Sequence, residues 1–336
     1  TMKTTTNLSS VYYVVSATSS SFTYKEITSN KNITEALLAS TEDDYGTSYY
    51  FRGTVTNNYV EFANKCWRIV RVGGDGSVKL ILHNDNTKKV ANPCDSANNS
   101  ASAAFARYSG TTYKSAFNTN SNDNAYVGFM YGTVGASDYA STHANTNKST
   151  ILTNLETWYN NNLKTYEKVI DDNVWCNDKT NVTDTTYDPW SITPNGLGYA
   201  KNVTYYGATQ RLVSTSGSAG GSAGGMGPSL NCNGKLSKIT SKIGLITADE
   251  LAFAGYAWNI DNTTTYLQEN ATGNSWWSLS PFCFDGDARV WGVGDSNGSF
   301  GLYMSNTLAV RPSISLISSV TISGGTGTSE DPYIIN

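Results

Sequence analysis

The residues most suggestive of recognition lie near the C-terminal end, between Pro281 and Asn306. This stretch mixes large aromatic side chains with acids, an arginine and sulfur, and glycines are spread among them. The candidate ligand-binding residues are Phe282, Phe284, Asp285, Asp287, Arg289, Trp291, Asp295, Asn297, Phe300, Leu302, Tyr303 and Met304. Cores do not mix these types freely, whereas exposed aromatics and arginine bury much area on binding at little entropic cost. The segment therefore predicts a binding surface. The alternative is that its Phe and Trp side chains fill a small satellite core.

Residues typical of catalysis are sparse and poorly placed. His83 ends an apolar strand and His143 lies in a polar loop, and neither has a recognisable nucleophile nearby in sequence. Asp249 and Glu250 fall in the first turn of a predicted capped helix, where acids complement the helix dipole. No catalytic residue is predicted. An extracellular glycan-active enzyme remains the alternative, because the many Tyr and Trp rings could stack on sugars and a spatial pair of carboxylates is hidden from sequence.

Metal and phosphate sites are not indicated either. The chain has no C-x-x-C spacing and only 2 His, which makes a zinc site improbable. Asp285-Gly286-Asp287 and the stretch 295–299 suggest calcium loops, but neither is completed by a glutamate at the EF-hand offset. The glycines of 214–227 are not followed by the Lys-Ser/Thr of a phosphate-binding loop. No cofactor is predicted, and bound structural calcium stays an open question.

The 5 Cys are widely spaced. In an exported chain this spacing predicts one or two disulfides and at least one odd thiol. Cys176 and Cys232 are the expected pair, because each lies in a polar loop beside the same Gly-rich insertion. Mass spectrometry of the unreduced protein is the direct check, since finding every thiol free would count against export.

The elements that must position these residues are mostly short strands. Alternating apolar residues predict strands over 49–55, 59–62, 67–72 and 78–82, and again over 275–281, 288–293 and 308–316. Apolar residues three and four apart between Ser149 and Asp172 predict the best helix. A capping box at Thr247 to Glu250 begins a second helix, which Gly255 ends. The pattern predicts an α+β fold with two main helices, short antiparallel strands and extensive loops.

Composition and charge narrow the function further. Charged residues make up 15% and aromatics 12%, and the formal net charge is −4. A surface of neutral polar groups is typical of an extracellular or recognition protein, and without a basic patch nucleic-acid binding is not expected. No apolar run approaches the ~18 residues of a membrane span, so this chain is not expected to insert into a membrane. An export signal or anchor is expected to be cleaved or to lie outside the sequence.

Three regions are expected along the chain. Residues 1–47 are Thr/Ser-rich and form a lead-in or stalk, with one short helical signal at Asn32 to Leu38. Residues 48–316 form the ligand-binding domain, which contains the insertion 214–227 and a variable region over 276–316. Residues 317–336 form a tail.

Several motifs of this domain resemble a known family. The segments Ser275 to Pro281, Ala288 to Val293 and Ala309 to Leu316 resemble the C-terminal variable region of diversity-generating retroelement target proteins. Ala309 departs from the more usual Gly-Val-Arg-Pro ending. Upstream segments at 50–53, 57–60, 67–71 and 243–250, with the tail 325–335, are similar to surface proteins of gut-type Gram-positive bacteria that carry such a domain.

The resemblance implies a C-type-lectin-like fold, shared with the formylglycine-generating enzyme, in which a fixed scaffold holds variable residues on a solvent-facing surface. Adenine-directed diversification would change the residues between Phe282 and Met304. The implied scaffold residues are Trp276, Trp277, Val290, Val293, Val310, Arg311, Pro312 and Leu316. Calcium-dependent sugar binding is not implied, because only Trp258-Asn259-Ile260-Asp261 approaches the lectin motif. Copper chemistry is not implied either, since Cys283 has no partner thiol nearby in sequence.

The resulting expectation is a non-enzymatic protein of the bacterial cell surface, or alternatively of a phage particle. Its variable face over about 282–306 would bind a protein or glycan ligand on a host, bacterial or phage surface. A structural pilus or fibre subunit is a further alternative, with the N-terminal region as its stalk.

Overall fold

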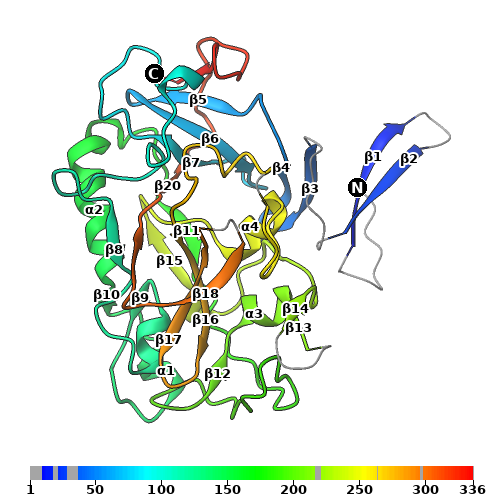
Figure 1. Ribbon diagram of the computed structural model, residues 1–336, viewed down its shortest axis with the longest axis vertical. Coiled ribbons are helices and arrows are strands. Elements are labelled where there is room, and N and C mark those ends of the chain that lie inside the picture. The colour runs from blue at the N-terminus through cyan, green and yellow to red at the C-terminus, as the bar shows by residue number, and fades with distance from the viewer. Residues whose placement is uncertain are drawn as a thin grey trace.

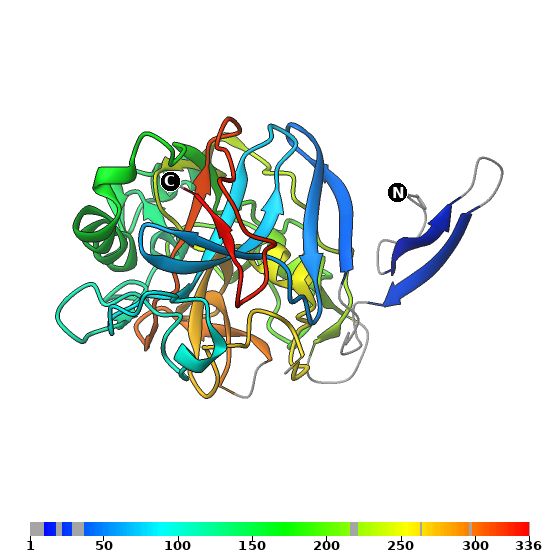
Figure 2. The same ribbon diagram turned by 90° about the horizontal axis from the view of Figure 1, so that it is seen from above.

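The computed structural model of the chain describes residues 10–17, 22–28, 37–215, 221–262, 264–295 and 298–335. The first two of these ranges are the strands β1 (Ser10–Ala17) and β2 (Phe22–Thr28), which pair with each other as an antiparallel hairpin. This hairpin stands apart from the rest of the molecule in both views (Figures 1 and 2). Most of the segment with the predicted helical signal, Asn32 to Leu38, lies outside the described residues. Its last two residues, Leu37 and Leu38, begin a strand rather than continue a helix.

The larger sheet contains seven strands and lies in the N-terminal half of the chain, with additions from the C-terminus. Its main path, in spatial order, is β20 (Ser313–Leu316), β7 (Val78–Asn84), β6 (Lys65–Val72), β4 (Gly46–Arg52) and β3 (Leu37–Asp43). Beyond this path, β5 (Tyr59–Phe62) pairs with β6 and with β21 (Tyr333–Ile334). The strands predicted over 49–82 are therefore present.

Two predicted boundaries differ from the structure. The sheet already includes β3 and β4, so the folded body begins no later than Leu37 rather than at residue 48. At the other end the predicted tail docks on the sheet, because β21 pairs in parallel with β5. Backbone hydrogen bonds to a neighbouring strand hold both segments on the body.

The second sheet contains six strands and carries the segment singled out in the sequence. Its path is β18 (Ser299–Tyr303), β17 (Ala288–Val293), β16 (Trp276–Phe284), β19 (Thr307–Ala309) and β8 (Lys114–Ala116), and β12 (Thr204–Tyr205) also pairs with β16. The predicted strand 308–316 is divided between the two sheets, with β19 in one and β20 in the other. Residues 310–312 thus carry the chain from sheet to sheet.

Helices are few, and the two predicted ones are the longest. The best helix, α2 (Thr150–Asn162), begins at the Ser149 cap but ends ten residues before the predicted limit at Asp172, where a 3₁₀ turn (Lys164–Tyr166) follows. The second, α4 (Ala248–Ala254), has the predicted capping box of Thr247 and Glu250 and ends at Gly255. In Figure 1, α4 lies between β4 and β16.

The remaining elements are short. The other α-helices are α1 (Tyr139–Thr142) and α3 (Gly207–Leu212). The remaining strands are β9 (Met130–Tyr131), β10 (Asn147–Lys148), β11 (Asn173–Cys176), β13 (Val213–Ser214), β14 (Ser222–Ala223) and β15 (Lys238–Ser241). Further 3₁₀ turns cover Ser96–Asn98, Asn124–Val127 and Lys235–Ser237. The fold is mixed α+β, with 15% helix and 32% strand.

One hydrophobic core joins both sheets to α2. It includes Trp67 and Leu80 of the larger sheet, Trp158 of α2, and Trp277 and Val290 of the smaller sheet. The implied scaffold residues of the C-terminal region are all buried: Trp276, Trp277, Val290, Val293, Val310, Arg311, Pro312 and Leu316. Their predicted place in the interior is confirmed.

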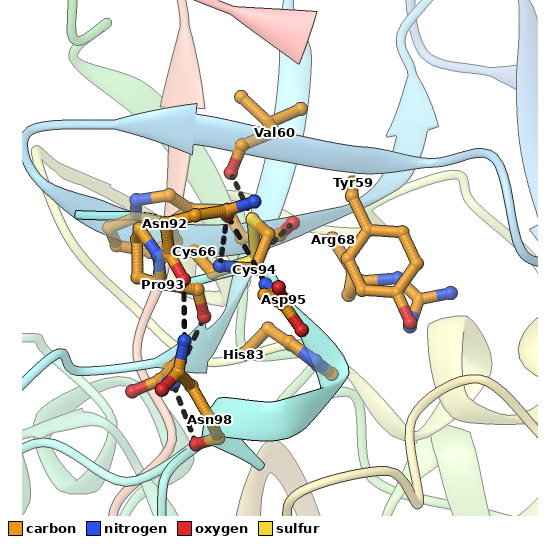
Figure 3. The surroundings of a disulfide bond; sticks show 12 residues. Tyr59, Val60, Cys66, Arg68, His83, Asn92, Pro93, Cys94, Asp95 and Asn98 are labelled. Carbon is orange, nitrogen blue, oxygen red and sulfur yellow. Dashed lines mark hydrogen bonds between the residues drawn. A yellow bond between two sulfur atoms is a disulfide. The ribbon is translucent and has the colours of Figure 1, made fainter. Parts of the chain in front are cut away.

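Two disulfides tie long loops to this body. The predicted pair Cys176–Cys232 is present, and Cys66 pairs with Cys94. The second bridge links the start of β6 to a polar loop, next to the side chains of His83 and Tyr59 (Figure 3). Cys283 is the free cysteine, and it is buried.

Candidate functional site

The predicted binding segment forms β16, β17, β18 and their connections, and both faces of this sheet are covered. One face packs on the main core through Phe284, Val290 and Met304. The other face, which carries Phe282 and Trp291, packs on a separate cluster formed by the loop around Tyr187 and by α3. The sheet is thus an inner layer of the molecule over most of its area.

Four of the predicted ligand-binding residues are therefore not solvent-facing. Phe282, Phe284, Trp291 and Met304 are each at most 3% exposed. The indole Nε1 of Trp291 donates to Thr209 Oγ1 at 3.1 Å. The expectation of an open surface is wrong for all four residues. The segment between Asn177 and Val213 covers Phe282 and Trp291, and for these two the satellite-core alternative describes the packing. Phe284 and Met304 belong to the main core instead.

The remaining candidates lie at the edges of this layer. Asp285, Asp287, Arg289, Phe300 and Leu302 are half-buried. Tyr303 is 40% exposed, and Asp295 is exposed. Asn297 lies outside the described residues.

Arg289 is the centre of a small polar group at one end of the sheet. It lies directly across from Tyr303 in the β17–β18 register. Its Nη2 lies 2.7 Å from Asp285 Oδ2 and donates to Tyr303 Oη at 3.0 Å, and its guanidinium lies 4.3 Å from the centroid of the Tyr303 ring. Its Nε is buried without a hydrogen-bond partner among the described residues. Asp287 is held by Ser121 Oγ at 2.6 Å. The arrangement presents a positioned cation and a phenol at the surface.

A partly exposed aromatic group lies on the same sheet, and two of its members were not among the sequence candidates. Trp258 stacks on Phe282 with ring centroids 5.1 Å apart and an interplanar angle of 18°. The ring centroid of Trp258 lies 5.3 Å from that of Trp190 and 6.2 Å from that of Phe300. Trp190 and Trp258 occur in polar loops that precede the variable region in the sequence. A large aromatic within an otherwise polar loop was the signal that could have found them.

The acids of α4 belong to a buried network of ion pairs. Glu250 Oε1 lies 2.7 Å from Lys79 Nζ and 2.9 Å from Arg71 Nε. Asp249 binds Arg211 through two hydrogen bonds of 2.7 and 2.8 Å. The structural role predicted for both acids is confirmed, although ion pairs add to the capping and dipole effects on which the prediction rested.

These ion pairs line a cleft with a cavity volume of about 40 Å³. Burial alone would raise the pKa of Glu250, but attraction to Lys79 and Arg71 outweighs this effect and lowers it to about 2. A general acid needs a pKa near the working pH. Glu250 therefore stays ionised at neutral pH.

The two histidines are buried in separate places. Burial lowers the pKa of His83 well below its usual value, and the positive charges of Arg68 and Arg311 lower it further. Burial likewise lowers the pKa of His143 to about 3. Both imidazoles are therefore neutral near pH 7. The thiol of Cys283 is also inert, because burial raises its pKa far above the usual range.

Among the described residues, no group of three or more His, Cys, Asp or Glu side chains is placed to hold a metal ion. No helix in the described part of the chain is long and apolar enough to cross a bilayer. No protein-family model, curated protein or solved structure matches this chain.

Proposed function

We propose that this chain is a non-enzymatic ligand-binding protein that works outside the cell. The observation that carries the proposal is that one sheet holds two partly exposed groups, Arg289 with Tyr303 and the aromatic rings of Trp258 with Phe300. Arginine and large aromatics in a partly desolvated setting are the residue types that dominate binding energy at interfaces. The disulfides support an oxidising compartment.

The sequence resemblance extends this proposal to a C-type-lectin-like fold and to diversification by a retroelement. Because several of the predicted ligand-binding residues are buried, the proposed variable face contains fewer residues than the sequence predicted. Substitutions at Asp285, Arg289, Phe300 and Tyr303 can change the surface without emptying the core, whereas Phe282 and Trp291 support the fold. The ligand would be a protein or glycan on another surface.

The diversification is tested in the nucleotide sequence beside the gene. We expect a near-identical copy of the region encoding Trp276 to Leu316, differing at adenines, next to a reverse-transcriptase gene. A complete genome without such a copy would exclude diversification, and a fixed binding role would then rest on the binding test alone.

The binding role is tested on arrays of glycans and of cell-surface proteins. We expect the wild-type chain to bind at least one component, and Arg289→Ala or Tyr303→Ala each to weaken that binding by more than about 1 kcal/mol. Both variants should melt within a few degrees of wild type. Trp291→Ala is the contrasting variant, because loss of a large buried ring should cost about 3–5 kcal/mol of stability. Equal loss of melting temperature in all three variants would place Arg289 and Tyr303 in the core and defeat the proposal.

A glycan-active enzyme is not favoured by the charged cleft. Glycoside hydrolysis uses one carboxyl group that is protonated at working pH. Lys79 and Arg71 keep the carboxyl group of Glu250 ionised, and Asp249 is paired with Arg211. Sustained turnover of a glycan substrate, abolished in Glu250→Gln, would reverse this assignment.

A further inference from the structure

Arg311 lies where the chain passes from the smaller sheet to the larger one, and its side chain is fully buried. Its Nε donates to the carbonyl oxygen of Leu82 at 2.9 Å, and its Nη1 donates to that of Leu267 at 2.5 Å. Its Nη2 has no partner among the described residues. The guanidinium carbon lies 5.0 Å from the centroid of the Trp276 ring. The guanidinium group of Arg311 thus contacts both sheets, and only some of its N–H groups have a hydrogen-bond acceptor.

Charge is not balanced in this region. Arg68 is also completely buried, and it forms an ion pair with Glu269 at 2.9 Å, under the ring of Tyr59 (Figure 3). Glu269 is the carboxylate whose charge acts on Arg311, but it is already bound to Arg68. Among the described residues Arg311 forms no ion pair of its own. Glu269 is therefore paired with Arg68 and not with Arg311, and a buried charge without a partner is costly.

Arg52 shows how a buried arginine without a carboxylate is otherwise compensated. Its Nη1 donates to the carbonyl oxygens of Ala252 and Phe253, at 2.6 and 2.9 Å. These carbonyls belong to the last turn of α4, where the ends of the peptide dipoles are negative. Arg311 binds two separate carbonyls that do not belong to a helix end, so it lacks this compensation.

Other buried polar atoms near Arg311 have no hydrogen-bond partner among the described residues either. Nε1 of Trp276 and Nδ1 of His83 are donors, the hydroxyl of Tyr266 can donate or accept, and Oε1 of Gln268 is an acceptor. His83 Nε2 accepts a hydrogen bond from Asn270 at 3.1 Å, so the neutral ring carries its proton on Nδ1. Tyr266 and Trp276 belong to one core cluster, and the charge of Arg311 acts on the pKa of Tyr266 and of His83.

We propose that Arg311 holds one small monovalent anion, such as chloride, in the interior between the two sheets, with Trp276 Nε1 as a second donor. A water molecule could accept from these two donors, but it would leave the charge of Arg311 uncompensated. An anion only accepts, and it also supplies the missing negative charge. Its role is to lock the smaller sheet against the larger one, independently of the proposed ligand face.

The first test compares thermal unfolding of the full chain in sodium chloride, bromide and gluconate at equal ionic strength. We expect the melting temperature to rise with chloride or bromide concentration by on the order of 5 °C at a hundred times the dissociation constant. Gluconate, which is too large for a buried site, should leave it unchanged. Identical melting curves in all three salts would overturn the proposal.

Variants separate this site from general salt effects. Trp276→Phe keeps a buried ring but removes the N–H donor, and we expect it to raise the half-saturating chloride concentration about fivefold, as loss of one hydrogen bond predicts. Arg52→Met is the matched control, because it removes a buried guanidinium outside the proposed site and should keep the wild-type chloride response. A wild-type response in Trp276→Phe, or its loss in Arg52→Met, would contradict the assignment.

Crystals grown in sodium bromide give a direct readout. We expect an anomalous bromine peak within hydrogen-bonding distance of Arg311 Nη2. Water without anomalous signal at that position would show that the unpartnered donors are hydrated, and the proposal would fail.

Discussion

Lys179 is the buried residue whose charge should be most visible in a measurement. Its Nζ donates to the carbonyl oxygens of Met130 and His143, at 2.6 and 3.2 Å, and to Asn145 Oδ1. Burial lowers the pKa of Lys179 to about 7, whereas an unfolded lysine has a pKa of about 10.4. Between these values the unfolded chain binds more protons, so the free energy of unfolding should rise with pH by about 1 kcal/mol per pH unit.

The prediction is tested by urea unfolding at pH 7, 8 and 9 in the wild type and in Lys179→Met. The variant should be less stable at each pH, because three acceptors lose their donor, and the part of the pH slope that Lys179 causes should disappear. Lys148→Met is the control, since Lys148 is exposed and should leave the slope unchanged. Parallel slopes in wild type and Lys179→Met would contradict a lowered pKa.

At the scale of elements, α4 is held by two separable effects. Thr247 and Glu250 form the capping box, and Glu250 also pairs with Lys79 and Arg71 of the larger sheet. Thr247→Ala removes the cap alone and should cost about 1 kcal/mol. Glu250→Gln leaves the buried Lys79 without its carboxylate, while Arg71 keeps its ion pair with Asp43, and should cost about 3–5 kcal/mol. Denaturant unfolding of both variants measures the difference, and equal losses would show that the ion pairs add nothing.

Strand β18 depends on a glycine for its contact with β16. A side chain at Gly301 would collide with the ring of Phe282, which lies over it. Gly301→Ala should therefore destabilise the protein by about 1–3 kcal/mol, because the ring must leave its packed position. Gly324→Ala is the control, since nothing lies within 4 Å of the added carbon. Thermal melts compare the two, and a neutral Gly301→Ala would show that Phe282 packs loosely.

At the scale of the whole molecule, the disulfides should decide whether the chain stays folded. One bridge joins residues that are 28 positions apart in the sequence, and the other joins residues that are 56 positions apart. In the chain-entropy account, closing loops of these lengths stabilises the folded state by about 4 kcal/mol each. Because total stability is about 5–15 kcal/mol, replacing either pair by serine should lower the melting temperature strongly. Replacing both should unfold the chain near 37 °C.

The thiols give the matching chemical readout. In the unreduced native protein, mass spectrometry after alkylation should show no modified cysteine, and unfolding without reductant should expose Cys283 alone. Cys283→Ser is the control for the melts, because it removes a thiol and leaves both bridges intact. Labelling of further cysteines in the unfolded, unreduced protein would contradict the pairing.

The sequence alone determined the local features whose causes are local. Thr247, Glu250 and Gly255 specify the beginning and end of α4 within one short stretch. Period-two alternation likewise predicted the strands, with β5 and β17 at their observed bounds. Polar loops beside one insertion were enough to indicate the pair Cys176–Cys232.

Tertiary structure decided which candidate residues can meet a ligand. Phe282 of β16 and Trp291 of β17 were predicted to lie on a surface because the residues between Pro281 and Asn306 show no core period. They are buried because α3 and the loop around Tyr187, roughly 70 to 110 residues earlier in the chain, cover them. Glu250 lies 171 residues from Lys79, and Arg311 lies 229 residues from Leu82. Burial and charge pairing depend on contacts between remote segments, and no local pattern of residue types contains that information.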